Sequence, residues 1–252
     1  MGQAYRNIES ADDLQYFVSS ESGMTKTFVT NDTGENSNTS ADAAIQLDTI
    51  PNIWVRWNEV PLAEDTEVLV RMRTTVNFSI NHGVVVRGQG QFGSTTASGY
   101  HLNIRGTIGF RDFRTVNNTE THFQAANVVN LTSTLEYNLL RVRAEGSTIR
   151  FKAWETGATE PDWQRTRTNT DVTGTGLVGL FLRGISASLL VDWIGAGWDG
   201  DPAPDGPVGG ISTEPFLLRH NPRLNKVIPV LSSPTVTDIG ANCVRPRVSK
   251  GY

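Results

Sequence analysis

The stretch from Tyr137 to Trp154 constrains the fold most, because polar and apolar residues alternate along it in two successive segments. A period of two is typical of a β-strand with one buried face. Glu145-Gly146-Ser147, between the segments, is a tight-turn sequence. The stretch therefore predicts an antiparallel hairpin with one apolar side, formed by Leu140, Val142, Ala144, Ile149, Phe151 and Ala153.

Two apolar runs follow, over residues 176–182 and 188–195. Because short connections join antiparallel neighbours, we expect them to complete one four-stranded antiparallel sheet with the hairpin. Ser10 and the Leu14, Phe17 and Val18 spacing predict a short helix near the start. Further strands are expected over residues 28–30, 44–47, 53–57, 66–76, 83–87, 98–104 and 107–114. Many strands with almost no helical pattern indicate an all-β antiparallel sandwich.

Three segments are expected along the chain. Residues 1–24 form an N-terminal arm, and residues 25–199 form the sandwich. Residues 200–252 begin with a Gly- and Pro-rich linker, GDPAPDGPVGG, which cannot continue a central strand. The tail beyond it contains apolar pairs but is too short to build its own core. We expect this extended tail to pack on its own domain or on a neighbouring subunit.

Four pieces of the sequence carry a resemblance: LLRVRAEGSTIRFKAW, EPDW, GLVGLFLR and LLVDWIGAG. Together they resemble the closing strands of a concanavalin A-like (laminin-G-like) jelly roll. The resemblance implies a fold rather than a function, because that fold carries lectins, hydrolases and purely structural modules. A second segment, PVLSSPTVTDIGANCVRPRV, is similar to carboxy-terminal segments of tailed-phage structural proteins.

Charge and cysteine content exclude several classes of protein. The net charge of −4 and a pI near 5.6 argue against general nucleic-acid binding, which needs a basic surface. The one cysteine, Cys243, cannot form an intrachain disulfide. Neither a signal peptide nor an apolar run of membrane-spanning length is visible. We therefore expect synthesis in a host cytoplasm, location in the virion and no membrane insertion.

Signatures of catalysis are weak. Laminarinase-like members of the concanavalin A-like group carry E-x-D-x-x-E, and here Glu160-Pro161-Asp162 is followed by Arg165 in place of the last Glu. We interpret Glu160 and Asp162 as solvated loop charges. The glycines of GQGQFG match a dinucleotide fingerprint, but a strand pattern follows them, which indicates a loop between strands. No cofactor is predicted.

Several residues are candidates for ligand binding, and each of them also has a simpler structural interpretation. A glycan site needs aromatic and planar polar side chains, and the candidates are Arg87, Tyr100, His101, Arg111 and Trp154. Ordinary cross-strand packing is the alternative for each of them. Asp199, Asp201 and Asp205 are calcium candidates, although a solvated acidic turn is the simpler interpretation. Asp192, beside Trp193, is expected to be buried and hydrogen-bonded.

These observations together predict a non-enzymatic bacteriophage virion structural protein: a capsid decoration, head fibre or tail component. Its partners would be other virion proteins and copies of itself in a closed homo-oligomer. Two alternatives remain open at this point. One is an adhesin that binds host surface glycans, and the other is a divergent glycoside hydrolase.

Overall fold

The computed structural model describes residues 2–8, 10–19, 25–29, 44–48, 53–75, 82–91, 94–104, 109–123, 131, 133, 135–182 and 189–206. The chain divides into two units, Met1–Arg219 and His220–Tyr252, and all described residues belong to the first. The expected packing of the C-terminal tail, with Cys243, therefore lies outside the described residues.

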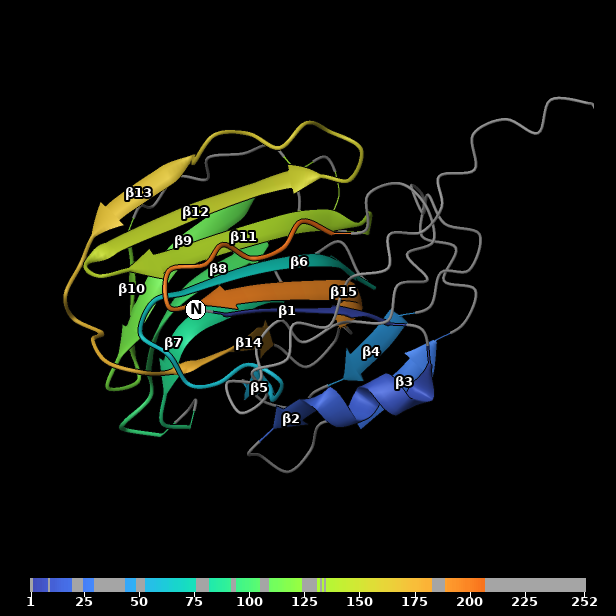
Figure 1. Ribbon diagram of the computed structural model, residues 1–252, viewed down its shortest axis with the longest axis horizontal. Coiled ribbons are helices and arrows are strands. Elements are labelled where there is room, and N and C mark those ends of the chain that lie inside the picture. Colours follow the sequence, from blue (N-terminus) through green and yellow to red (C-terminus); the bar gives the residue numbers. More distant parts are fainter. Residues whose placement is uncertain are drawn as a thin grey trace, which may run out of the picture. The chain divides into compact units, whose positions relative to one another are not determined.

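Two antiparallel sheets make up the described structure. Sheet A has the order β13 (Arg165–Thr168), β12 (Thr148–Glu155), β11 (Asn138–Glu145), β6 (Thr66–Thr74), β15 (Leu189–Trp198), β4 (Ala44–Asp48) and β3 (Thr25–Val29), with β1 (Gly2–Asn7) also paired to β15. Sheet B has the order β10 (Thr119–His122), β9 (Phe110–Val116), β8 (Ser98–Ile104), β7 (His82–Gln89), β14 (Leu177–Leu182), β5 (Ile53–Trp57) and β2 (Phe17–Ser19). The predicted all-β antiparallel sandwich is confirmed (Figure 1).

The predicted hairpin is β11 and β12. Val142 pairs with Phe151 and Leu140 with Ala153, so the apolar residues of both strands share one face. Gly146 adopts a left-handed φ of 52° in the turn, a conformation that glycine enters without a steric penalty. The apolar face joins the main core, which draws on both sheets. Alternation alone was sufficient to identify this element and its buried side.

The four-stranded arrangement expected for residues 137–195 is wrong. β14 pairs with β5 and β7 in sheet B, whereas β15 pairs with β6 in sheet A. The polar segment between β12 and β14, which includes the short strand β13, is long enough to cross between the sheets. A neighbouring apolar run can therefore join the opposite layer, because its alternation specifies a buried face and no particular partner.

The start of the chain belongs to sheet A. β1 runs antiparallel to β15, with Ala4 opposite Ala196. The expected helix is a 3₁₀ turn, η1 (Ala11–Tyr16), where the Ser10 backbone N donates to Asp13 Oδ2 at 3.0 Å. The proposed boundaries near residues 24 and 199 stay predictions, although β1 is an integral strand. Over the described ranges, no helix is long and apolar enough to cross a membrane.

Candidate functional site

The five predicted glycan contacts lie in three separate places. Tyr100 points from β8 into the core, and Arg87 lies at the bulge near the end of β7. His101 and Arg111 alternate to the outer face of sheet B, meaning the side turned away from sheet A. Trp154 lies on the outer face of sheet A. The structure therefore does not bring these residues together into one site.

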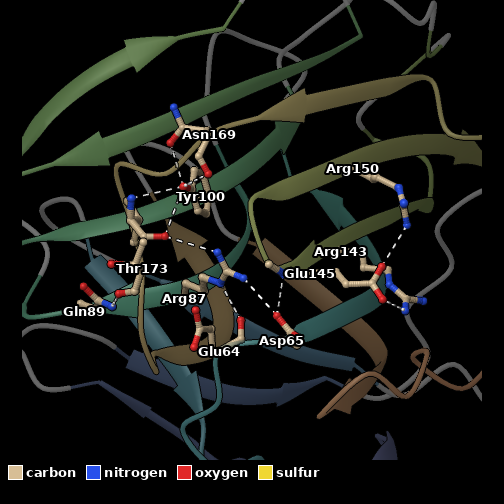
Figure 2. Close-up of polar contacts among 12 residues, drawn as sticks. Glu64, Asp65, Arg87, Gln89, Tyr100, Arg143, Glu145, Arg150, Asn169 and Thr173 are labelled. Atoms are coloured by element: carbon tan, nitrogen blue, oxygen red, sulfur yellow. Dashed lines mark hydrogen bonds and ion pairs between the residues drawn. The ribbon is translucent and has the colours of Figure 1, made fainter.

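Arg87 is buried and forms hydrogen bonds with several loops (Figure 2). Its φ is +50°, and its Nε donates to the Glu64 carbonyl oxygen at 2.5 Å. Its Nη2 pairs with Asp65 Oδ1 at 3.2 Å, and the same carboxylate accepts from the Gly146 backbone N at 2.8 Å. Its Nη1 donates to the Val172 carbonyl oxygen at 3.3 Å. The guanidinium thus joins two loops and, through Asp65, also the turn at Gly146, which is a structural role.

Tyr100 has no exposed surface for a ligand. Its Oη lies 2.7 Å from Asn169 Oδ1, to which it donates, and it accepts from the Val172 backbone N at 3.2 Å (Figure 2). Burial raises the pKa of the Tyr100 phenol. A sugar could reach this hydroxyl only after the loop around residues 169–172 had been displaced.

His101 is the centre of an aromatic cluster on the outer face of sheet B. Its ring stacks on Phe113 with centroids 4.4 Å apart and meets Phe181 edge-on at 5.0 Å. Its Nε2 lies 3.1 Å from Thr115 Oγ1, and Trp54 is 5.5 Å away between centroids. These side chains are almost completely buried, so the cluster is packed and has no open aromatic platform.

Carboxylates are scarce on this face. In the described strands of sheet B, the register turns Glu120 of β10 outward, at the edge of the sheet. Asp112 of β9 points inward instead, where its Oδ2 accepts from Arg167 Nε at 3.2 Å. The described part of this face therefore presents one carboxylate, whereas retaining glycoside hydrolysis uses two, about 5–5.5 Å apart.

The outer face of sheet A carries a network of ion pairs, and Glu67 lies at the centre of it. This side chain is almost fully buried, with Arg141 Nε 3.6 Å from Oε1 and Arg143 Nη1 3.3 Å from Oε2. Burial raises the pKa of the Glu67 carboxyl, and the two guanidinium groups oppose that rise. A buried carboxylate between two cations is a structural arrangement when both cations are fixed by other contacts.

Both arginines are fixed in that way. Arg141 pairs with Glu160 at 3.0 Å and with Asp205 at 2.5 Å. Arg143 pairs with Glu145 at 3.2 Å, and Glu145 continues to Arg150 at 3.3 Å (Figure 2). The result is one chain of alternating charges across β6, β11 and β12.

Lys152 connects this network to two tryptophans. Its Nζ pairs with Glu160 at 2.6 Å and lies 4.5 Å from the centroid of Trp163 and 5.9 Å from that of Trp154. Lys152 also donates to the Pro161 carbonyl oxygen at 3.1 Å. The interpretation of Glu160 as a solvated loop charge is therefore wrong, because its loop folds back onto β12. Asp162 in the same loop is exposed, as expected.

Asp192 confirms its expected role. Its Oδ2 forms an ion pair with Arg71 Nη1, and both side chains are largely buried. The Arg71 guanidinium also lies 4.3 Å from the centroid of Tyr137 and donates to Thr156 Oγ1 at 3.3 Å.

The calcium candidates do not form a cage. Asp205 is bound to Arg141, and Asp199 adopts a left-handed φ of 57° in the turn after β15. Over the ranges that the structure covers, no three His, Cys, Asp or Glu side chains are grouped as metal ligands. Asp205 is thus better explained as the anion that Arg141 holds.

The named carboxylates of sheet A all contact a cation: Glu67, Glu145, Glu160, Asp192 and Asp205. General acid or base catalysis needs a carboxyl that can exchange a proton with a substrate. Held carboxylates of this kind are suited to fixing the fold and its attached segments.

No family model and no curated protein matches this sequence. Solved structures similar to it include a β-glucanase from Bacillus licheniformis, at 13% identity and a TM-score of 0.49, which covers 78% of this chain and 98% of that one. The carbohydrate-binding module CBM66 from Bacillus subtilis has 13% identity and a TM-score of 0.45, over 70% and 96% of the two chains. Galectin LEC-6 from Caenorhabditis elegans has 14% identity and a TM-score of 0.37, over 58% and 89%.

The all-β antiparallel sandwich is shown by the chain's own two sheets, and at these identities the likeness to the solved structures is one of fold alone.

Sequence reasoning missed Glu67, Lys152 and Trp163 as members of one surface. Charged residues at alternate positions of β11 and β12 were a usable signal, since Arg141, Arg143 and Lys152 must share a face. The partner Glu67 comes from β6, which is distant in sequence, and no local pattern could reveal it.

Proposed function

We propose that this chain is a non-enzymatic structural module of a bacteriophage particle, where it associates with copies of itself and with other virion proteins. The observation that carries the proposal is that both outer faces are occupied by the chain's own contacts. Sheet A holds an ion-pair network and the segment Asp201–Gly206, and sheet B holds a buried aromatic cluster. Such a sandwich is suited to being a rigid body to which terminal segments are attached.

The absence of catalysis is part of the proposal. Two features of the described residues support it: the lone outward carboxylate, Glu120, on sheet B, and the cation-bound carboxylates on sheet A. Neither supplies the acid and nucleophile pair that a retaining glycosidase needs. Incubation with β-glucans and bacterial capsular polysaccharides should release no reducing ends above a heat-treated control.

The phage context rests on the sequence. Residues 229–248 are similar to carboxy-terminal segments of tailed-phage structural proteins. We therefore propose synthesis in the host cytoplasm and location in the virion.

Quantitative mass spectrometry of purified virions tests the role directly. The phage that encodes this chain should contain it in many copies per particle, retained through a high-salt wash. Its presence only in the soluble lysate, with virions free of it, would overturn the proposal. A host protein of equal abundance provides the control for carry-over.

Glycan binding is a second candidate, favoured by Trp163. This ring is only partly buried, lies 4.5 Å from Lys152 Nζ, which pairs with Glu160, and comes from a loop at the edge of sheet A. An accessible aromatic ring beside planar polar groups is the usual sugar platform. Trp163 thus replaces Tyr100 as the residue to test, because Tyr100 lies in the core.

A glycan array of bacterial surface polysaccharides separates the candidates. Under the second candidate, binding appears with the unmodified chain, falls at least tenfold in Trp163→Ala and is kept in Leu62→Ala. Leu62 is an exposed residue that serves as the matched control. A blank array with folded protein would exclude this candidate and leave the structural proposal standing.

A further inference from the structure

A groove on the outer face of sheet A holds the segment Asp201–Gly206, which we call the strap. Its floor is β15, where Gly195 and Gly197 have no side chains: a methyl group at Gly197 would overlap the backbone oxygens of Asp201 and Pro202. Ala203 of the strap is 3% exposed and packs among Leu69, Trp154 and Trp193. The strap therefore packs its backbone directly against positions of β15 that carry no side chain.

Polar contacts fix the strap in register. Gln3 Nε2 donates to the Pro202 carbonyl oxygen at 2.8 Å, and the Ala203 backbone lies close to the Glu67 carboxyl. At its end, Asp205 Oδ1 lies 2.5 Å from Arg141 Nη2. The acidic side chain of Asp205 thus pairs with the basic side chain of Arg141. Ala203, between Pro202 and Asp205, makes the apolar contact.

The connection between the strap and sheet A is a two-residue turn. Asp199 and Gly200 have φ values of +57° and +91°, and the position where a Gly200 side chain would lie is open space. Hydrogen bonds hold the turn from three sides: Asp199 N donates to the Asp65 carbonyl oxygen at 2.9 Å, Asp201 N to the Trp198 carbonyl oxygen at 3.3 Å, and Arg143 Nη2 to the Gly200 carbonyl oxygen at 3.3 Å. A change of φ and ψ at these residues would swing the strap away as one piece.

We infer that this groove is also an assembly site, which accepts the strap of a second copy of the chain. An exchanged strap would make every contact that the resident strap makes, so the exchange costs only the turn and the entropy of association. Exchange needs a high local concentration, because the covalent connection gives the resident strap an effective concentration of about millimolar order. Copies crowded on a particle meet that condition, and in this sense the inference rests on the proposed function.

The occupant is specified by the groove itself. The side-chain-free floor admits backbone, Arg141 selects an acidic residue at the strap's end, and the small pocket beside Trp193 admits Ala203 and Gly206.

Two full-length variants test exchange by complementation. Gly197→Val blocks the groove and keeps the strap, whereas Ala203→Glu disables the strap, since its carboxylate would enter an apolar pocket near Glu67, and keeps the groove. Neither variant can dock a strap in its own groove. Mixed at about millimolar concentration, they should form a heterodimer through the one intact strap and the one intact groove, observed by native mass spectrometry.

Controls make the result specific. The double variant Gly197→Val/Ala203→Glu, mixed with Ala203→Glu, should give no heterodimer. Asp205→Asn on the strap-donating copy should weaken association only about twofold to fivefold, because the Asp205 side chain is largely exposed. Asp162→Asn, at an exposed carboxylate in the same region, should leave association unchanged.

A mixture of folded variants that remains monomeric would overturn the inference. Far-ultraviolet circular dichroism verifies folding, and Gly197→Ala replaces Gly197→Val if the larger residue prevents it. Hydrogen exchange gives a second readout: the Ala203 amide should lose protection in Gly197→Val alone and regain it in the mixture. Failure here would leave the particle measurement untouched, because virion content is measured independently of strap exchange.

Discussion

The two outer faces of this sandwich are closed by opposite chemistry. On sheet A, charges are paired across strands and the strap lies over two glycines. On sheet B, aromatic rings pack around His101 and the described face has little charge. Antiparallel sheets usually leave one face wet. The difference teaches that the contribution of sheet A to stability should depend on charge and pH. The contribution of sheet B should depend on how well its buried side chains fill the available volume.

The largest effect is expected on sheet B. Phe181→Ala removes a fully buried ring that contacts His101 and Phe113, and should lower the free energy of unfolding by about 3–5 kcal/mol. Leu62→Ala, at an exposed position, should change it by less than about 0.5 kcal/mol. Urea unfolding measures both. A loss below about 1 kcal/mol for Phe181→Ala would mean that this face is loosely packed.

On sheet A, the corresponding test is the Arg71–Asp192 pair. Asp192→Ala leaves the Arg71 guanidinium largely buried without its main anion, and should cost about 3 kcal/mol. Its residual contacts with Tyr137 and Thr156 limit the loss. The double variant Arg71→Met/Asp192→Ala should be clearly more stable than the sum of its single variants predicts. Simple additivity would contradict a coupled pair.

A smaller effect, confined to sheet A, is the pH dependence of stability that Glu67 causes. Its raised pKa means that the folded state holds the proton more tightly than the unfolded chain does. The stabilisation is complete below the unfolded value of 4.5 and is lost as the pH rises through the raised folded pKa.

Relative to Glu67→Gln, the unmodified chain should therefore lose stability as the pH rises above the unfolded value of 4.5. Parallel urea titrations over this range provide the measurement, with Asp162→Asn as the exposed control. A gain in relative stability over the same range would show that Arg141 and Arg143 outweigh burial.

The smallest effect is expected at the exposed end of the ionic network. Glu145 is 43% exposed and pairs with Arg143 and Arg150. Glu145→Gln should cost less than about 1 kcal/mol, and the difference should disappear in about 1 M salt. Thermal unfolding at two salt concentrations measures it, and a cost that survives high salt would argue for a role beyond charge.

Sequence patterns predicted individual strands better than their partners. The alternation in β6 and β11 specified which side chains enter the core, and the structure agrees. The same alternation could not assign β14 to sheet B, since both layers offer an apolar surface. Pairing of β1 with β15 joins residues that are far apart in sequence, so no local signal indicated it.

The candidate site was harder still, because residue type indicates chemistry and gives no orientation. Tyr100 and His101 are adjacent on one strand and must face opposite sides, so they could not form one site. The strap was interpreted as a linker because Gly and Pro suit both linkers and close packing. Only Gly195 and Gly197, on a different segment, distinguish the two cases.

The position of β15 has a consequence for synthesis. It is the last described strand, yet it lies in the middle of sheet A, between β6 on one side and β1 and β4 on the other. At about 5–20 residues per second, a ribosome needs roughly 10–40 seconds to pass from β1 to β15. Throughout that time the nascent chain presents unpaired strand edges, so chaperones and translation rate should decide how much of it matures.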